Sequence, residues 1–295
     1  MTAVPIVLVG GGLGAGKTSL LRTLMASPQL PRLGLVVNEF GELDVDGALL
    51  AQSGSPVVTL PNGCVCCAAG GDLAAAVGRL LRGPGPFDAL VVELSGVADP
   101  YPVLQELRLL GAAVRLANVI AVVDLDRPTS AAVGDPVLLR LLSIADTIVL
   151  NKRDLATADR LAAWRDLAGA SNPRAQVHAA EHGGLPLAVV LDAQHTERPS
   201  GASGQAAHAA FHTKTVMVPA GLSRARLQAA LAPPFDIERV KGFVCLAEGP
   251  FLVQVVRGHA TFEPLDRSPP QAALNKLVLI SSDAARLQAQ AAALW

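Results

Sequence analysis

The chain has 295 residues, of which 51% are hydrophobic, and its net charge is −1 at pH 7. This length allows one large domain or two smaller ones with a substantial core. The near-neutral charge and the 3% aromatic content argue against nucleic acid and anionic membranes as partners. No apolar run is long enough to cross a bilayer, and we identify no targeting segment, so we expect a cytoplasmic protein.

The first part of the chain alternates apolar strands with helical patterns. Helices are predicted at residues 17–27 and 102–110, and strands at 5–10, 34–40, 88–96, 118–126 and 146–154. Strands that are apolar throughout and separated by helices are typical of a parallel sheet covered on both faces. The pattern therefore predicts an α/β domain over residues 1–192.

The regular pattern ends at residues 193–208, where small, polar and turn-forming residues dominate. We interpret this stretch as a linker. After it, helices are predicted at 223–232 and 284–294, and strands at 211–218, 239–248, 251–259 and 276–281. This order predicts a smaller α+β domain with an antiparallel sheet over residues 209–295.

The segment GGLGAGKT directly follows the first predicted strand and matches the phosphate-loop pattern G-x-x-x-x-G-K-[ST]. Its glycines let backbone N–H groups surround phosphates, while Lys17 would neutralise the β- and γ-phosphates and Thr18 would bind Mg²⁺. A dinucleotide fingerprint in the same letters, with Glu39 ending the second strand, is a less specific match. We expect nucleotide contacts from Gly11, Gly12, Leu13, Gly14, Ala15, Gly16, Lys17, Thr18 and Ser19.

The segment NKRD ends a later predicted strand and resembles the N-K-x-D motif of GTPases. The resemblance implies that Asp154 accepts hydrogen bonds from guanine N1 and N2. Adenine offers no such pair of donors, so a carboxylate here favours GTP over ATP. Asn151 would support the loop and contact the base edge, and the Lys152 stem would lie along the face of the base.

The segment ELSG lies between these two motifs, at the end of a predicted buried strand. The carboxylate of Glu93 would reach the Mg²⁺ shell or the attacking water, and the Gly96 N–H would meet the γ-phosphate. We expect a catalytic role for both residues, together with Lys17 and Thr18. A solvated strand end is the alternative, and the task of Glu93 is left open.

Three of the four cysteines, Cys64, Cys66 and Cys67, lie within PNGCVCCAAGG, among turn-forming residues. A disulfide is disfavoured in the cytosol, whereas a redox pair remains an alternative because Cys64 and Cys67 have C-x-x-C spacing. Converging thiolates select Zn²⁺, Cu⁺ or iron over Mg²⁺ and Ca²⁺. We therefore interpret the segment as a transition-metal site, completed by a nearby carboxylate, and we expect the isolated Cys245 to lie in a core.

The six histidines are scattered along the chain. His208 and His212 have helical i, i+4 spacing beside the predicted linker. A weak second metal site is conceivable there, but solvated linker residues are the favoured interpretation.

Five segments follow one another along the chain: GGLGAGKT, NEFGELDVDG, NGCVCC, ELSGVADP and NKRD. With this combination the chain resembles the CobW-like metallochaperone GTPases, which include zinc-regulated metalloprotein activators and nitrile hydratase activators. The C-terminal domain fits as well, since RVKG at 239–242 matches the family's R-x-K-G segment. The resemblance implies a GTPase with the phosphate-loop NTPase fold of the CobW/HypB/UreG class.

The resemblance also implies metal bound by Cys64, Cys66 and Cys67, with switch movements that link this site to the nucleotide. Glu39 and Glu42 fall in the family's switch-like N-E-F-G-E segment. Glu42 is a candidate fourth ligand for the transition metal, and Glu39 joins Thr18 as a candidate Mg²⁺ ligand.

The chain departs from the family pattern in three ways. Leu141 stands where many members have Gln, four residues before an Ala-Asp pair, and Val37 replaces a frequent Glu before N-E-F-G-E. A histidine-rich run is also missing near the C-terminal domain, which speaks against metal storage by histidines.

These features predict a GTP-hydrolysing metallochaperone that uses GTP and Mg²⁺ and delivers Zn²⁺, or alternatively Co²⁺ or Fe²⁺, to a client metalloprotein. One alternative is a GTP-regulated protein that senses zinc or docks on a client without transferring metal. Another, an ATP-dependent redox enzyme, requires NKRD to be accidental. A homodimer that depends on nucleotide or metal is left open.

Overall fold

The computed structural model describes residues 3–27, 32–38, 56–60, 72–83, 86–96, 98–191, 193, 195, 211–219, 221–256, 258–265, 269 and 273–294. The described residues fall into two compact units, an N-terminal one that ends at His195 and a C-terminal one that begins at Phe211. None of the helices in these ranges is long and apolar enough to cross a bilayer.

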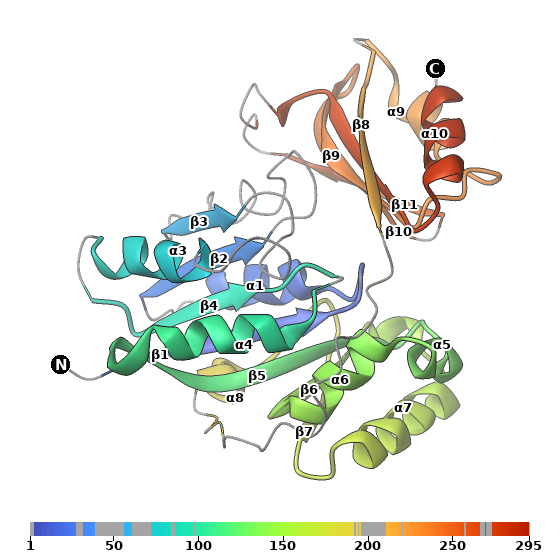
Figure 1. Cartoon of the computed structure of the whole chain (residues 1–295). Coiled ribbons are helices and arrows are strands. Elements are labelled where there is room, and N and C mark those ends of the chain that lie inside the picture. Colours follow the sequence, from blue (N-terminus) through green and yellow to red (C-terminus); the bar gives the residue numbers. More distant parts are fainter. Residues whose placement is uncertain are drawn as a thin grey trace. The chain divides into compact units, whose positions relative to one another are not determined.

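The N-terminal unit is built on a seven-stranded sheet in the order β3-β2-β4-β1-β5-β6-β7 (Figure 1). Every pair of neighbouring strands is parallel. The strands are β1 (Val4–Gly11), β2 (Leu33–Asn38), β3 (Val57–Leu60), β4 (Ala89–Glu93), β5 (Val114–Asp124), β6 (Thr147–Asn151) and β7 (Gln176–Ala179). The predicted α/β fold with a mainly parallel sheet is confirmed.

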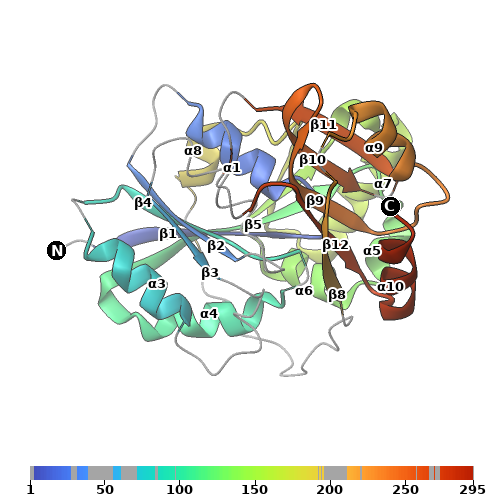
Figure 2. The same ribbon diagram turned by 90° about the horizontal axis from the view of Figure 1, so that it is seen from above.

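Helices cover both faces of this sheet, as Figure 2 shows. One face packs against α1 (Lys17–Met25) and α8 (Leu187–Leu191). The other packs against α3 (Asp72–Leu81), α4 (Pro100–Leu109), α5 (Thr129–Val133), α6 (Pro136–Ile144) and α7 (Ala158–Ser171). Short 3₁₀ turns occupy Gly111–Ala113 and Arg153–Leu155. Because side chains alternate along a strand, the central strands must be apolar on both sides, which explains their continuous apolar runs.

Polar residues at the starts of three helices fix where those helices begin. Asp99 accepts a hydrogen bond from the Tyr101 N–H at the start of α4, and Asp135 accepts one from the Leu138 N–H at the start of α6. Both helices also carry proline at their first position, where no N–H is needed. Thr157 caps α7 in the same way.

The order of the strands places three functional segments at the same end of the sheet. β1 lies between β4 and β5, and β6 follows β5. Parallel strands end at a common edge, so the loops after β1, β4, β5 and β6 lie together there. These loops contain the phosphate-loop, ELSG and NKRD segments.

The C-terminal unit is a five-stranded antiparallel sheet in the order β11-β10-β9-β12-β8. Its strands are β8 (His212–Met217), β9 (Arg239–Leu246), β10 (Gly249–Val256), β11 (His259–Pro264) and β12 (Lys276–Ser281). Two helices, α9 (Arg224–Ala230) and α10 (Ala284–Ala292), share a core with apolar side chains of the strands. The predicted α+β unit is therefore confirmed.

The prediction that Cys245 lies in a core is wrong, because its side chain is exposed. Cys245 lies near the end of β9, where its neighbours Val244 and Leu246 point into the core shared with the helices. Alternation along the strand turns the thiol to the opposite face. The Cys245 N–H donates to Asn275 Oδ1 at 2.7 Å.

Candidate functional site

The phosphate-loop segment connects β1 to α1, and two of its glycines are required by close contacts. Gly11 has φ +149°, and a Cβ there would lie 2.2 Å from the Val122 carbonyl oxygen. Gly16 has φ +98°, and a Cβ there would lie 2.2 Å from Asn151 Nδ2. Any larger residue would therefore force the loop away from β5 or β6.

Lys17 is the first residue of α1, and its side chain is buried over the loop. Its Nζ donates to the carbonyl oxygens of Gly11 at 2.9 Å and Gly12 at 3.1 Å. The cation is thus held beside the loop whose N–H groups would receive phosphates, and its contact with the phosphates stays a prediction.

Thr18 and Glu93 are 75 positions apart in sequence but are in contact in the structure. Thr18 Oγ1 donates to Glu93 Oε1 at 3.1 Å, and Glu93 is 4% exposed. A hydroxyl and a carboxylate oxygen are ligands of the kind that Mg²⁺ prefers, so this pair fits an Mg²⁺ site. The structure thus brings the start of α1 and the end of β4 together, and the roles of Thr18 and Glu93 toward Mg²⁺ or the attacking water stay predictions.

The segment after Glu93 lies against the phosphate loop. A Cβ on Gly96 would approach the backbone N and Cα of Leu13 to 2.7 and 2.8 Å, so only glycine allows this contact. The hydroxyl of Ser95 is buried and has no hydrogen-bond partner among the described residues. The Gly96 N–H and the Ser95 hydroxyl are therefore donors beside the loop.

Asn151 joins the NKRD segment, residues 151–154, to the phosphate loop. We call this segment the base-side motif, after the base contact predicted for it. Its Nδ2 donates to the Ala15 carbonyl at 2.9 Å, and its Oδ1 accepts from the Gly183 N–H at 2.9 Å. Asn151 is 2% exposed, so both bonds are shielded from water. The amide thus joins the phosphate loop to the loop after β7 through both of its polar atoms, and its contact with a base edge stays a prediction.

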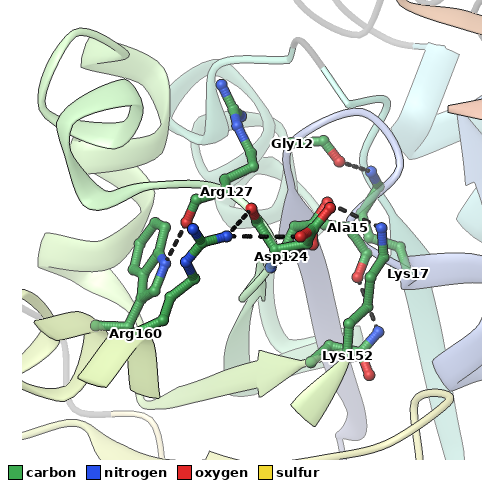
Figure 3. A network of polar contacts seen from close by, with 10 residues as sticks. Gly12, Ala15, Lys17, Asp124, Arg127, Lys152 and Arg160 are labelled. Carbon is green, nitrogen blue, oxygen red and sulfur yellow. Dashed lines mark hydrogen bonds and ion pairs between the residues drawn. The ribbon is translucent and has the colours of Figure 1, made fainter. Parts of the chain in front are cut away.

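The other two NKRD residues that we assigned to the nucleotide differ in their surroundings. Lys152 has a left-handed backbone, with φ 62°, and its Nζ pairs with Asp124 Oδ2 at 2.9 Å. Asp154 is exposed in the 3₁₀ turn, so its carboxylate is accessible to a base. Figure 3 shows Lys152 and Asp124 together beside the phosphate loop.

Sequence reasoning missed three parts of this site: Asp124, Arg127 and the loop after β7. Asp124 is 3% exposed at the end of β5, and an Asp that closes an apolar strand run was the available signal. The loop after β7 contacts the base-side motif through Gly183 and through the Ala180 carbonyl, which accepts from the Arg153 N–H at 3.0 Å. Because β7 lies at the edge of the sheet, the sequence offered no comparable signal for this loop.

The predicted metal residues Cys64, Cys66, Cys67, Glu39 and Glu42 lie outside the described residues, as does His208. Within the described ranges, no cluster of three or more His, Cys, Asp or Glu side chains could hold a metal ion. His212 is exposed at the start of β8. The structure thus leaves the transition-metal site as a prediction.

Two family models cover most of the chain. The CobW/HypB/UreG nucleotide-binding domain matches residues 5–179, and the C-terminal domain of the cobalamin synthesis protein cobW matches residues 210–294. The chain belongs to the CobW/HypB/UreG family. As a member of this family it shares the nucleotide-binding domain that the loop geometry indicates.

Relatives within the CobW family carry names that refer to zinc. The Escherichia coli zinc chaperone YjiA is 33% identical over 65% of this chain, and this chain spans 62% of the length of that protein. The E. coli zinc chaperone YeiR is 30% identical, with 97% of this chain and 96% of that protein covered. The zinc-regulated GTPase metalloprotein activator 1 of Schizosaccharomyces pombe is 30% identical over 64% of this chain.

The fold also agrees with a solved member of the CobW family. The crystal structure of Zn(II)-bound YjiA GTPase from E. coli is similar with a TM-score of 0.51 and 23% identity, covering 99% of this chain and 98% of that one. At this identity the likeness concerns the fold.

The two positions where this chain departs from the family pattern are both buried, Leu141 in α6 and Val37 in β2.

Proposed function

We propose that this protein is a GTP-hydrolysing metallochaperone that binds a transition metal, Zn²⁺ in the first place, and delivers it to a client metalloprotein. The observation that carries the nucleotide part is the double hydrogen bond of Asn151, which ties the phosphate loop to the base-side segment. One buried side chain thereby sets the spacing between the loop for the phosphates and the carboxylate for the base.

The residues around the loop support a hydrolase. Lys17 would move from its carbonyl acceptors to the β- and γ-phosphates, and the Leu13 and Gly96 backbones lie together where the γ-phosphate would end. Thr18 and Glu93 would hold Mg²⁺, which neutralises phosphate charge when it is bound. Alternatively, the Glu93 carboxylate would orient the attacking water.

Asp154 supports guanine as the base. Its carboxylate is exposed, in a turn that the Lys152–Asp124 ion pair and the Arg153 N–H hold in place. A carboxylate accepts two hydrogen bonds from guanine N1 and N2, whereas adenine would leave it unpaired. We infer that GTP is the substrate and that ATP is discriminated against at this residue.

The metal part of the proposal rests on the sequence of Cys64, Cys66 and Cys67 and on the relatives named zinc chaperones. Three thiolates in four positions fit a soft or borderline ion and leave one position for Glu42 or for a ligand of the client. GTP would tighten this site, and hydrolysis would loosen it and release the metal. Linkage requires that the metal tighten GTP binding by the same factor.

The test is a Co²⁺ titration of the full chain, with a GTP analogue, with GDP and without nucleotide. Thiolate–Co²⁺ charge-transfer absorption reports the ligands directly. We expect the band to vanish when Cys64, Cys66 and Cys67 are replaced by Ser, and affinity to be at least about fivefold higher with the GTP analogue than with GDP. The matched control is Cys245→Ser, which removes an exposed thiol outside the motif and should keep the band.

Two outcomes would overturn the proposal. A band that survives in the triple variant would remove the cysteine motif as the metal site. Equal affinity with the GTP analogue and GDP would remove nucleotide-coupled delivery. Transfer of Zn²⁺ to an apo-client then separates a chaperone from a zinc-sensing protein that only docks.

A further inference from the structure

Arg127 lies beside the phosphate loop, just after β5, and its backbone is fixed from two sides. Its N–H donates to the Asp124 carbonyl at 3.1 Å, and its own carbonyl accepts from Trp164 Nε1 at 2.7 Å. Trp164 is a fully buried residue of α7. The backbone position from which the Arg127 side chain extends is therefore fixed relative to β5.

The guanidinium of Arg127 reaches the phosphate loop at Gly12. Its Nη1 lies 3.2 Å from the position that a Cβ on Gly12 would take. The carbonyl of the same Gly12 accepts a hydrogen bond from Lys17 Nζ at 3.1 Å. Two cationic groups from different elements thus approach one residue of a loop built to receive an anion.

The described surroundings of Arg127 use little of its capacity to bind anions. The nearest carboxylate is Asp135 Oδ2, at 4.0 Å from Nη1, and both side chains are partly exposed, at 21% and 31%. Exposed pairs of this length contribute little to stability. The guanidinium makes no hydrogen bond to any residue that the structure describes, so its five N–H donors can serve a ligand.

The chemistry of the position points to phosphate. A planar guanidinium binds two oxygens of a phosphate at once, and it stays charged at every physiological pH. A phosphate bound beside Gly12 would attract both the Arg127 guanidinium and the Lys17 ammonium group, which approach that residue from different elements. Figure 3 shows the Arg127 side chain extending away from Asp124 and Lys152, beside the loop that carries Gly12.

We propose that Arg127 binds the γ-phosphate of the bound nucleoside triphosphate in cis, and stabilises the charge that this group carries during hydrolysis. The inference rests on the proposed function, because it needs a nucleotide in this loop. It adds a residue from outside the phosphate-loop, ELSG and NKRD segments. Arg127 would discriminate triphosphate from diphosphate, since GDP has no group at that position.

The test compares Arg127→Ala and Arg127→Lys with the wild type and with a matched control, Arg160→Ala. Arg160 carries the same side chain in the same region, but it pairs with Asp126. We expect Arg127→Ala to lower kcat for GTP by about 100-fold, as for the removal of other single charged or polar donors at a reacting group. Arg127→Lys should recover part of the rate, and Arg160→Ala should be close to wild type.

A binding titration gives a second measurement that does not depend on turnover. Arg127→Ala should weaken binding of a non-hydrolysable GTP analogue and of GDP with aluminium fluoride, and leave the affinity for GDP within about twofold. If all three affinities stay at the wild-type values, or if GDP affinity falls as much as that of the analogue, the proposal is overturned.

A double-mutant cycle with Gly12→Ala tests the contact itself. The added methyl group would lie 3.2 Å from Arg127 Nη1, at the mobile end of the side chain, and should displace the guanidinium. We expect Gly12→Ala to weaken binding of the GTP analogue in the wild type and to add little in the Arg127→Ala background. Fully additive effects would refute the contact.

These measurements separate the two proposals. A wild-type protein that binds GTP but does not hydrolyse it contradicts the proposed hydrolase, while the titrations still decide whether Arg127 reads the γ-phosphate. A wild-type protein that hydrolyses GTP and is unaffected by Arg127→Ala contradicts only the inference about Arg127.

Discussion

Replacement of Asn151 by Ala should weaken the binding of every nucleotide equally, although Asn151 belongs to the base-side motif. Both hydrogen bonds of the Asn151 side chain go to backbone groups of the protein, so neither depends on which base is bound. The side chain holds the Ala15 carbonyl at 2.9 Å and the Gly183 N–H at 2.9 Å. Its removal would therefore act on the position of the phosphate loop.

The size of the effect follows from burial. Asn151 is 2% exposed, and both of its bonds lie away from water. Alanine would leave one buried acceptor and one buried donor without a partner, at about 1–3 kcal/mol for each group. We expect the free energy of unfolding of the nucleotide-free protein to fall by roughly 2–6 kcal/mol, the upper end applying if no water enters.

Urea denaturation of the nucleotide-free protein measures the stability, and competition titrations with GDP, IDP and XDP measure the binding. The three diphosphates share phosphates and differ in the base. Their affinities should fall by one common factor in Asn151→Ala. Asp154→Ala is the matched control, because it lies in the same motif but is exposed, and it should leave stability nearly unchanged.

Two results would refute this reasoning. A loss of stability below about 0.5 kcal/mol, the range of ordinary surface substitutions, would mean that the two bonds are not important. A selective loss for guanine nucleotides would mean that Asn151 acts on the base and not on the loop.

Three further predictions concern single residues. Lys17→Ala should abolish phosphate release from GTP and sharply weaken the GTP analogue, because the loop loses its cation; a normal hydrolysis rate would exclude Lys17 from the site. Asp154→Asn should lower affinity for GTP and raise it for xanthosine triphosphate, and an unchanged preference in competition assays would remove the assignment of guanine. Burial alone raises the pKa of Glu238, but hydrogen bonds from Ser282 and Ser281 outweigh it, so the pKa lies below the ordinary value of 4.5. Folding thus favours the ionised form, and the wild type should be more stable than Glu238→Gln above pH 4.5 and lose this advantage as the pH falls below it. Urea denaturation across pH 3–7 checks this, and a difference independent of pH would contradict it.

The central sheet could be predicted because its strands are buried on both faces. In β1, Ile6 and Leu8 point to the core under α3 to α7, while Val7 and Val9 point to the core under α1 and α8. Such strands leave continuous apolar runs in the sequence. Gly11 and Gly16 could be identified from the phosphate-loop pattern. The structure adds the cause, because a Cβ would meet the Val122 backbone at Gly11 and the Asn151 side chain at Gly16.

Edge strands could not be predicted in the same way. β3 and β7 lie at the two ends of the sheet, each with only four residues, and both are partly exposed. A strand that buries few side chains shows only a weak pattern of apolar residues in its sequence. The position of Cys245 was predicted wrongly because its neighbours in the sequence are apolar. The same neighbours would flank a buried residue and an exposed residue near the end of a strand.

In the site, the sequence identified residues but could not show which of them contact each other. Lys152 was expected along the face of a base, and the structure shows its Nζ paired with Asp124, from a neighbouring strand. Arg127 carried no motif at all. Contacts between loops of different strands depend on the order of the strands in the sheet. No local pattern in the sequence specifies that order.

The phosphate loop and the NKRD segment, the two proposed nucleotide-binding segments, are connected through β5 and β6 as well as through Asn151. Asp124 and Asn151 face each other in the register of these strands. Asp124 holds Lys152 through its side chain and the Arg127 N–H through its carbonyl, while Asn151 holds Ala15 in the phosphate loop. A movement of the base-side turn must therefore strain Asp124 or the Asn151 amide, and both are almost fully buried. If both segments bind the nucleotide as proposed, a substitution in the base-side motif should also affect binding of the phosphates, because these buried contacts join the two segments.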